Sequence, residues 1–344
     1  MSVTSSQSGI EAEPDVDSQG QNIVETAQYF IKKTASLNIV KTTIQPNGQI
    51  IDWIPIESQG EVASPPPLPA LPSRRSTNAK DDSESWKTNR PLFLLEQPGS
   101  EKGPGGTVPI LRQDLNLISG KQTLVQRLSK PPLPPGKKED QTAWPHWYAS
   151  TGQSVNNLGT NGGVSCYKAA VQNLADFSLL QTAVIKNNVP ILGHPSASCV
   201  QTVEVGWINY PAQVAEPHLF TFFNTNGYTE IADYKGGWNT DVKGWVQYDN
   251  TIFPGTVLTP LCVDGGSQTE LPIQVQLHQG NWWVLILDRW IGYYPASLFS
   301  NNVDDPARTL AQGSDQIDWY GEIYQTDVDL TTTDMGSGQW PSTG

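Results

Sequence analysis

The stretch TVEVGWI, residues 202–208, decides the fold, because it alternates like a β-strand with one buried face. One face carries Val203, Val205 and Trp207, and the other carries Glu204, Gly206 and Ile208. The stretch IDWYGEIY, residues 317–324, repeats the pattern, with Asp318, Tyr320, Glu322 and Tyr324 opposite its other four residues. Both stretches therefore predict strands that carry a glutamate opposite their main hydrophobic set.

Further short strands are predicted throughout the chain beyond Trp144. The runs are apolar or alternating, with Gly, Asn and Pro between them: VSCYKAAVQ, FSLLQTAVI, HLFTFF, IQVQLH and WWVLIL. Only Pro295–Ser300 has a brief helical pattern. Many short strands at this spacing predict an all-β sandwich or barrel.

The first 145 residues are a different kind of polypeptide, with 17 of the 27 prolines and 15 of the 21 lysines and arginines. Residues 21–37 predict a short helix with an apolar face made of Ile23, Val24, Ala27, Phe30 and Ile31. Asn47-Gly48 lies between two strand-like runs and predicts a β-hairpin. The Pro-rich stretches 64–85 and 129–140 are expected to be extended and exposed, because their composition cannot bury a core.

Charge and hydropathy exclude two kinds of partner. Residues 146–344 contain 6 Lys and Arg against 18 Asp and Glu, which makes binding to a phosphate backbone improbable. The longest strongly apolar stretch, Trp282–Leu287, is far shorter than the roughly 20 residues of a bilayer span. We therefore expect neither a nucleic-acid nor a membrane partner. The few basic groups also leave little self-repulsion in acid, which suits an acidic environment.

Neither the N-terminus nor the cysteines identify a compartment. The first residues have neither the basic start nor the apolar centre of a Sec-type signal peptide. Cys166, Cys199 and Cys262 lie too far apart for the C-x-x-C spacing of zinc or redox sites, and their pairing stays open.

The sequence contains none of the familiar motifs of nucleophilic or metal catalysis, such as G-x-S-x-G or H-E-x-x-H. The histidines are scattered and are expected to be structural or solvent-facing: His146, His194, His218 and His278. Carboxylates remain, and no metal or cofactor is expected. Glu204 and Glu322 are either ordinary solvent-facing strand residues or part of a cleft floor, since glutamate is depleted in strands and a glycine lies near each.

An ordered set of motifs carries a family resemblance: GTVPILR (106–112), VEVGW (203–207), NWWVLI followed by GYYPASLF (281–299), DWYGEIY (318–324) and MGSGQWP (335–341). Through them the chain from about Gly106 onward resembles the neprosin family of glutamic peptidases, and NGQIIDWIPI (47–56) resembles the family's activation segment. The resemblance implies an antiparallel, jelly-roll-like catalytic β-sandwich over residues 141–344. A propeptide helix and hairpin at 1–63 and an extended, Pro-rich propeptide and linker at 64–140 would precede it.

Transferred residue by residue, the resemblance implies that Glu204 and Glu322 are the catalytic pair. The implied activity is that of an endopeptidase made as a zymogen, which cleaves after proline at acidic pH. Its implied partners are proline-containing peptides or proteins and its own propeptide. The implied location is secreted or in an acidic extracytoplasmic compartment. Trp53 stands where a cysteine is usual in the family, so disulfide pairing is not carried over.

Paired carboxyls suggest a mechanism, because two of them facing each other cannot both ionise cheaply and one stays protonated in mild acid. We expect the ionised glutamate to take a proton from an attacking water and the protonated one to polarise the scissile carbonyl, without a metal. Which glutamate has which role stays open. Trp207, Tyr320 and Tyr324 are candidates to bind a proline ring, although Trp207 shares the face of Val203 and suits the core better.

Two other functions stay open. A glycoside hydrolase also uses paired carboxylates, and a Trp-rich sandwich could hold a sugar. A non-catalytic carbohydrate-binding module would use its aromatic residues alone. Activity on a peptide rather than an oligosaccharide separates these alternatives. The prolines of residues 129–140 further predict that an enzyme cutting after proline could cleave its own linker.

Overall fold

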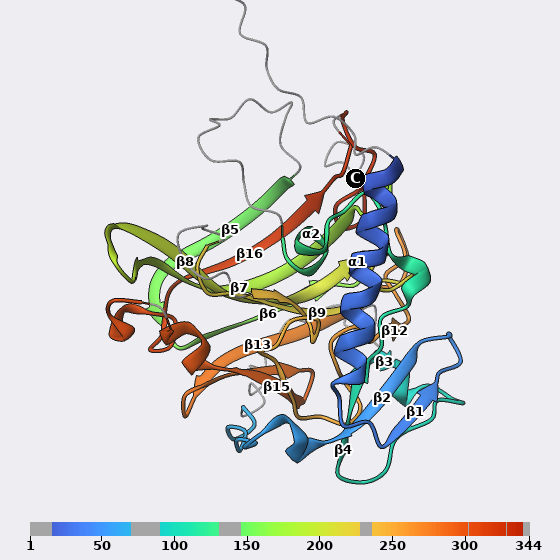
Figure 1. Ribbon diagram of the computed structural model, residues 1–344, viewed down its shortest axis with the longest axis horizontal. Coiled ribbons are helices and arrows are strands. Elements are labelled where there is room, and N and C mark those ends of the chain that lie inside the picture. The colour runs from blue at the N-terminus through green and yellow to red at the C-terminus, as the bar shows by residue number, and fades with distance from the viewer. Residues whose placement is uncertain are drawn as a thin grey trace, which may run out of the picture.

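The computed structural model describes residues 16–69, 90–130, 146–227, 236–301, 303–327 and 329–339. Two antiparallel sheets form a β-sandwich, which confirms the expected all-β fold (Figure 1). The six-stranded sheet has the order β10 (Gly236–Trp238), β9 (His218–Asn224), β8 (His194–Asn209), β7 (Phe177–Ile191), β16 (Ser314–Tyr324) and β5 (His146–Asn157). The five-stranded sheet has the order β11 (Val246–Gln247), β15 (Arg289–Pro295), β14 (Asn281–Ile286), β13 (Glu270–His278) and β6 (Gly159–Ser165).

The main core lies between the two sheets and follows the alternation seen in the sequence. β8 contributes Val203, Val205 and Trp207, all buried, and β13 contributes Ile273 and Val275 from the opposite side. Each such side chain stabilises the fold by about 1.5–3 kcal/mol when it is fully buried. Because successive strand residues face opposite sides, the residues between the valines of β8 point to the outer face of the six-stranded sheet.

That outer face carries a second apolar cluster, rich in aromatic rings. Its members are Phe177, Leu179, Ile208, Tyr210, Ala212, Phe220, Phe222, Trp238 and Tyr324. They are buried although they lie on the far side of the sheet from the main core. The N-terminal part of the chain contributes to covering this face, which makes its placement relevant to function.

The N-terminal part contains the predicted helix and hairpin. They are α1 (Val16–Ala35), β1 (Lys41–Ile44) and β2 (Ile50–Pro55), with Gly48 at φ +86° in the turn. β4 (Thr107–Leu111) adds a third strand, β3 (Leu92–Phe93) pairs with β12 (Leu258–Thr259), and α2 (Leu124–Leu128) follows. Short 3-10 helices occupy Ile56–Gln59, Leu94–Glu96, Leu115–Leu117, Ala296–Ser300 and Pro306–Arg308. In Figure 1, α1 runs along one side of the molecule, with the β1–β2 hairpin at its lower end.

The expectation of an extended segment over residues 64–140 is wrong for residues 90–130. This range contains β3, β4 and α2, and it buries Phe93 and Leu94 completely or nearly so. Short apolar runs between the prolines supply enough buried surface to order the chain. Residues 70–89 and 131–145 lie outside the described residues.

The expected apolar face of α1 is confirmed for Phe30, which is buried, but it is wrong for Ile23, Val24 and Ile31, which are exposed. The buried positions are Thr26 and Phe30. Polar contacts set this orientation: the Asn22 side chain donates to the Gly120 carbonyl at 3.0 Å, and the Tyr29 hydroxyl donates to the Asp241 carbonyl at 2.6 Å. Within the described part of the chain, no helix is both long and apolar enough to cross a bilayer.

Candidate active site

Glu204 and Glu322 come together on the outer face of the six-stranded sheet. β8 and β16 are the two neighbours of β7, so their glutamates flank that strand, Glu204 opposite Ala183 and Glu322 opposite Leu179. Both are buried, with exposures of 4% and 0%. Strand pairing thus joins two carboxylates that are far apart in sequence.

Lys130 bridges the two glutamates. Its Nζ donates to Oε2 of Glu204 at 2.5 Å and to Oε2 of Glu322 at 2.7 Å. The lysine side chain is buried as well. The two carboxyl groups therefore face each other across a single nitrogen atom, and that nitrogen occupies the space between them.

Ser129 and Lys130 contradict the expectation that residues 129–140 are exposed. Both are buried, and Lys130 makes its ion pairs at the centre of the site. The reason is that two buried carboxylates attract a cation strongly enough to draw the end of α2 onto the sheet. The remainder of that predicted linker, residues 131–140, lies outside the described residues.

Neutral donors hold the rest of Glu204. Gln181 Nε2 and the Tyr320 hydroxyl donate to its Oε2 at 2.7 and 3.2 Å, and the Thr202 hydroxyl donates to Oε1 at 2.8 Å. Because a buried carboxyl group is costly without hydrogen bonds, these contacts offset part of the cost of its burial and fix its orientation.

Glu322 has a different set of partners on its Oε1. His146 Nδ1 lies 2.8 Å from this oxygen, and the Tyr148 hydroxyl donates to it at 3.3 Å. The expectation that all four histidines are structural or solvent-facing is therefore wrong for His146, which contacts the site directly. Its position at the first residue of β5 places it beside the carboxyl end of β16, where Glu322 lies.

Burial and charge act in opposite directions on Glu322. Burial raises its pKa, but the charge of Lys130 and the hydrogen bonds from His146 and Lys130 outweigh burial and lower the pKa to about 2. Burial lowers the pKa of Lys130, while the two carboxylates outweigh that effect and raise it. Burial, followed by the charges of both glutamates, raises the pKa of Tyr148. With Lys130 in place, Glu322 therefore stays ionised in mild acid.

Aromatic rings surround the bridging nitrogen. The ring centroids of Phe222, Trp238 and Tyr320 lie 5.4, 5.6 and 5.5 Å from Lys130 Nζ, within the range of cation–π attraction. These rings border the dyad and form an apolar wall beside the two carboxyls.

The other two aromatic candidates lie elsewhere. Trp207 is packed between the sheets and donates its Nε1–H to the Tyr167 carbonyl at 3.1 Å, so it does not reach the dyad. Strand alternation is the reason, since Trp207 and Glu204 are an odd number of residues apart. Tyr324 is buried against His146, with ring centroids 4.9 Å apart, and contacts the site through that histidine.

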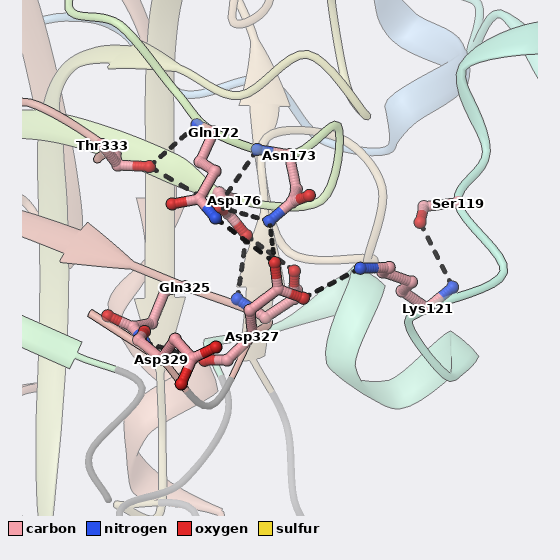
Figure 2. Close-up of polar contacts among 10 residues, drawn as sticks. Ser119, Lys121, Gln172, Asn173, Asp176, Gln325, Asp327, Asp329 and Thr333 are labelled. Atoms are coloured by element: carbon pink, nitrogen blue, oxygen red, sulfur yellow. Dashed lines mark hydrogen bonds and ion pairs between the residues drawn. The ribbon is translucent and has the colours of Figure 1, made fainter. Parts of the chain in front are cut away.

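Residues 121–130, which we call the strap, approach the site along the sheet. Lys121 pairs with Asp327 at 2.8 Å, and Asn173 donates to the other oxygen of the same carboxylate (Figure 2). Further along, Arg127 pairs with Asp241 at 3.2 Å. Each of these ion pairs joins a cation of the strap to an anion of the sandwich, and the last of them is Lys130 on the dyad.

A cavity of about 570 Å³ opens on the other side of Thr202, and neither glutamate of the dyad lines it. Thr202, which donates to Glu204, is one of its lining residues, together with Asn187, Asn188 and Asn224.

Sequence reasoning missed several residues of the site. Gln181 had a signal, since it is a polar side chain within the apolar run FSLLQTAVI. Phe222 and Trp238 had none beyond their apolar character, and Lys130 lies in a stretch without periodicity. Among the described residues, no group of three or more His, Cys, Asp and Glu is arranged to hold a metal ion.

The neprosin family model matches residues 175–344, a range that contains both glutamates but neither Lys130 nor His146. One solved structure is described as concerning endo-acting O-glycanases that prominent members of the human gut microbiota express to initiate mucin breakdown. It is 9% identical, and the match covers 52% of this chain and 51% of that chain at a TM-score of 0.29. The chain spans about half the length of that structure, and so weak a likeness carries no functional argument.

Proposed function

Through residues 175–344 the chain is a member of the neprosin family, and on that premise we propose that it is a glutamic endopeptidase that cleaves after proline at acidic pH. The observation that supports this most directly is the pair Glu204 and Glu322, which face each other across one nitrogen atom. Two opposed, buried carboxyls are equipped to share one proton once the lysine has left.

The proposed reaction uses water as the nucleophile. The ionised glutamate accepts a proton as a water attacks the scissile carbonyl carbon, and the protonated glutamate donates a hydrogen bond to the carbonyl oxygen. Collapse of the intermediate breaks the C–N bond, and the amine nitrogen receives the proton of the acidic carboxyl. The products are a carboxylic acid and an amine, and the pair again holds one proton. Activity falls as the pH rises, because deprotonation of the second carboxyl removes the acid.

A preference for proline is supported by the aromatic wall. Phe222, Trp238 and Tyr320 enclose the position that Lys130 Nζ occupies beside both carboxyls. A pyrrolidine ring offers an apolar, compact surface to such rings and loses little conformational freedom on binding. Tyr320 also contacts Glu204, so the same side chain would border both the pocket and the reacting group.

Latency is supported by the strap. Lys130 fills the space between the carboxyls, and the ion pairs of Lys121 and Arg127 hold the strap in place. Protonation of Glu322 in mild acid does not release it, because Glu322 keeps a pKa of about 2 beside Lys130, so acid incubation would act by allowing molecules that open transiently to cleave others. We therefore propose that activation requires cleavage of the chain. Cleavage after the prolines at 131, 132, 134 or 135, outside the described residues, would use the enzyme's own specificity.

The proposed place of action is outside the cytoplasm, secreted or in an acidic compartment. The support is compositional: residues 146–344 carry only 6 Lys and Arg, so few positive charges repel one another when carboxylates are protonated. The proposed partners are a proline-containing substrate and the N-terminal part of the same chain.

The proposal is tested with the full-length chain, incubated at acidic pH and then given a peptide with one internal proline. Mass spectrometry of the products should locate a single cut after that proline. Glu204→Gln and Glu322→Gln should each lower the rate at least about 100-fold with an unchanged fold, because each removes a proton-transferring group. Glu216→Gln is the matched control, since Glu216 is exposed and, among the described residues, its carboxylate pairs with exposed Lys168. Wild-type cleavage by either dyad variant would exclude the mechanism, and cleavage of an oligosaccharide in place of the peptide would exclude the function.

A further inference from the structure

His146 is held rigidly against one member of the dyad. Its Nδ1 lies 2.8 Å from Glu322 Oε1, and both side chains are only 1% exposed. Tyr148 stacks on the imidazole, with ring centroids 6.0 Å apart and planes at 8°, and Tyr324 packs against it at 4.9 Å. The Nε2 atom is buried without a hydrogen-bond partner among the described residues. The bond to Glu322 is thus the polar contact that orients this ring.

The two glutamates differ once the contacts of the strap are set aside. Glu204 retains the amide of Gln181 and the hydroxyls of Thr202 and Tyr320, all of them neutral donors. Glu322 retains Tyr148 and His146, and the histidine is able to carry a positive charge. Among the described contacts of the pair, His146 is the one group besides Lys130 whose side chain is able to carry a positive charge.

The surroundings of Glu322 hold no second source of positive charge among the described contacts. β5 presents His146 and Tyr148, and β8 presents Glu204. β7 presents the neutral amide of Gln181, and β16 itself adds Tyr320. At acidic pH an imidazole beside a carboxylate carries a proton and favours the ionised carboxylate. The charge distribution of the pair therefore depends on His146 after the strap has left.

We infer that His146 is a positioning residue that keeps Glu322 ionised, so that Glu322 is the general base and Glu204 carries the shared proton as the general acid. This inference rests on the proposed peptidase function and assigns unequal roles within the same site. In the reaction, one proton of water passes to Glu322 and the proton of Glu204 passes to the departing amine. The proton on Glu322 then returns to Glu204, and His146 neither gains nor loses a proton. The lowered pKa of Glu322, to which the histidine contributes, agrees with this direction.

The matched variants are His146→Asn and His146→Ala. Asparagine offers a neutral N–H donor near the position of Nδ1 but never a positive charge, whereas alanine removes both. The readout is kcat/KM against pH for the proline peptide, with acid-processed protein in every case. Loss of the charge should raise the pKa of the base, so the acidic limb of the profile should move up by about one pH unit or more. The rate below that limb should fall about tenfold, while the basic limb keeps its place in His146→Asn.

Whether the acidic or the basic limb of the pH profile moves in the His146 variants decides which glutamate is the base. If the basic limb moves and the acidic limb does not, Glu322 is the acid and the inferred roles are reversed. If neither limb moves, His146 is merely structural and the inference fails. Inactive wild-type protein, or an active Glu322→Gln variant, would instead exclude the proposed peptidase function. Failure of the inference about His146 is therefore distinguishable from failure of the proposed function.

A second measurement leaves the histidine intact and does not depend on folding of its variants. Because neither dyad variant is expected to process itself, each is first cleaved in trans by a trace of active wild-type enzyme. In processed Glu204→Gln, Glu322 titrates without its partner, and in processed Glu322→Gln, Glu204 does so. Carbon-13 NMR of labelled glutamate carboxyls should place the titration of Glu322 at least one pH unit below that of Glu204. Equal or reversed values would overturn the inference.

Discussion

Replacing Lys130 with methionine tests the link between the closed site and its chemistry. Lys130→Met keeps an unbranched apolar stem among Phe222, Trp238 and Tyr320 but removes the charge that joins the two carboxylates. The variant should be less stable than the wild type at neutral pH. It should also cleave the proline peptide at acidic pH while its chain is still intact.

The magnitude follows from the electrostatics of Glu322. Its pKa is lowered from 4.5 to about 2, which corresponds to about 3 kcal/mol at neutral pH, part of it due to His146. Removal of one partner from a buried ion pair costs about 3–5 kcal/mol, in agreement. For 344 residues, an unfolding entropy of about 2.1 cal/mol/K per residue converts ~3 kcal/mol into a fall of about 4 °C in Tm.

The pH dependence has a definite sign. A lowered carboxyl pKa stabilises the folded wild type above the unfolded value of 4.5, and this stability is lost as the pH falls toward 2. The methionine variant lacks that contribution but gains a shared proton in acid. The difference in Tm should therefore be largest near pH 7 and should shrink below pH 4.5.

Thermal unfolding at pH 7 and pH 3.5, with peptide cleavage by mass-verified intact chain, measures both effects. Lys168→Met is the control, because Lys168 and its partner Glu216 are both more than half exposed and contribute little. An equal Tm difference at the two pH values would refute the electrostatic argument. An intact Lys130→Met chain that is no more active than intact wild type would refute the blocking role of the lysine.

Two further substitutions test the strand and the pocket. Gly206→Ala would place a Cβ 2.0 Å from the Leu180 carbonyl oxygen, so the urea midpoint of unfolding should fall by the equivalent of about 1–3 kcal/mol or more. Gly20→Ala is the control, because no atom lies within 4 Å of its Cβ and the variant should be neutral or slightly stabilising. Equal midpoints for the two variants would contradict this packing. Trp238→Phe should raise KM for the proline peptide more than for the same peptide with alanine in that place, and an equal rise for both would remove Trp238 from the proline pocket.

The orientation of the dyad could be predicted because it is a local property. Alternation along TVEVGWI and IDWYGEIY determines which side chains share a face, whatever the rest of the chain does. The same rule places Trp207 in the core, where the structure has it. Adjacency of Glu204 and Glu322 required more, since pairing of β8 and β16 with β7 is a long-range event. The family resemblance supplied that step.

The roles of Lys130 and His146 could not be predicted from the sequence, for a different physical reason. Neither lies in a stretch whose periodicity reports a buried face, and each acquires its role from the partner it meets. Lys130 follows a five-residue helix, and it is buried because two carboxylates outweigh the cost of burying an ammonium. The buried face of α1 was predicted correctly only at Phe30, since hydrogen bonds from Asn22 and Tyr29, rather than an apolar stripe alone, orient the helix.

Charge counting links the latent and active forms of the proposed enzyme. With the strap in place, and leaving aside His146, which keeps its own charge in both forms, two carboxylates and one ammonium leave one net negative charge in a site that water hardly reaches. Once Lys130 departs, the same net charge is restored only if the pair takes up one proton. A buried pair with two negative charges would be strongly disfavoured, so the proton replaces the lysine electrostatically. An acidic pH optimum then follows from the burial of the pair as well as from the need for a general acid. The same burial explains why a single lysine is sufficient to inhibit the dyad.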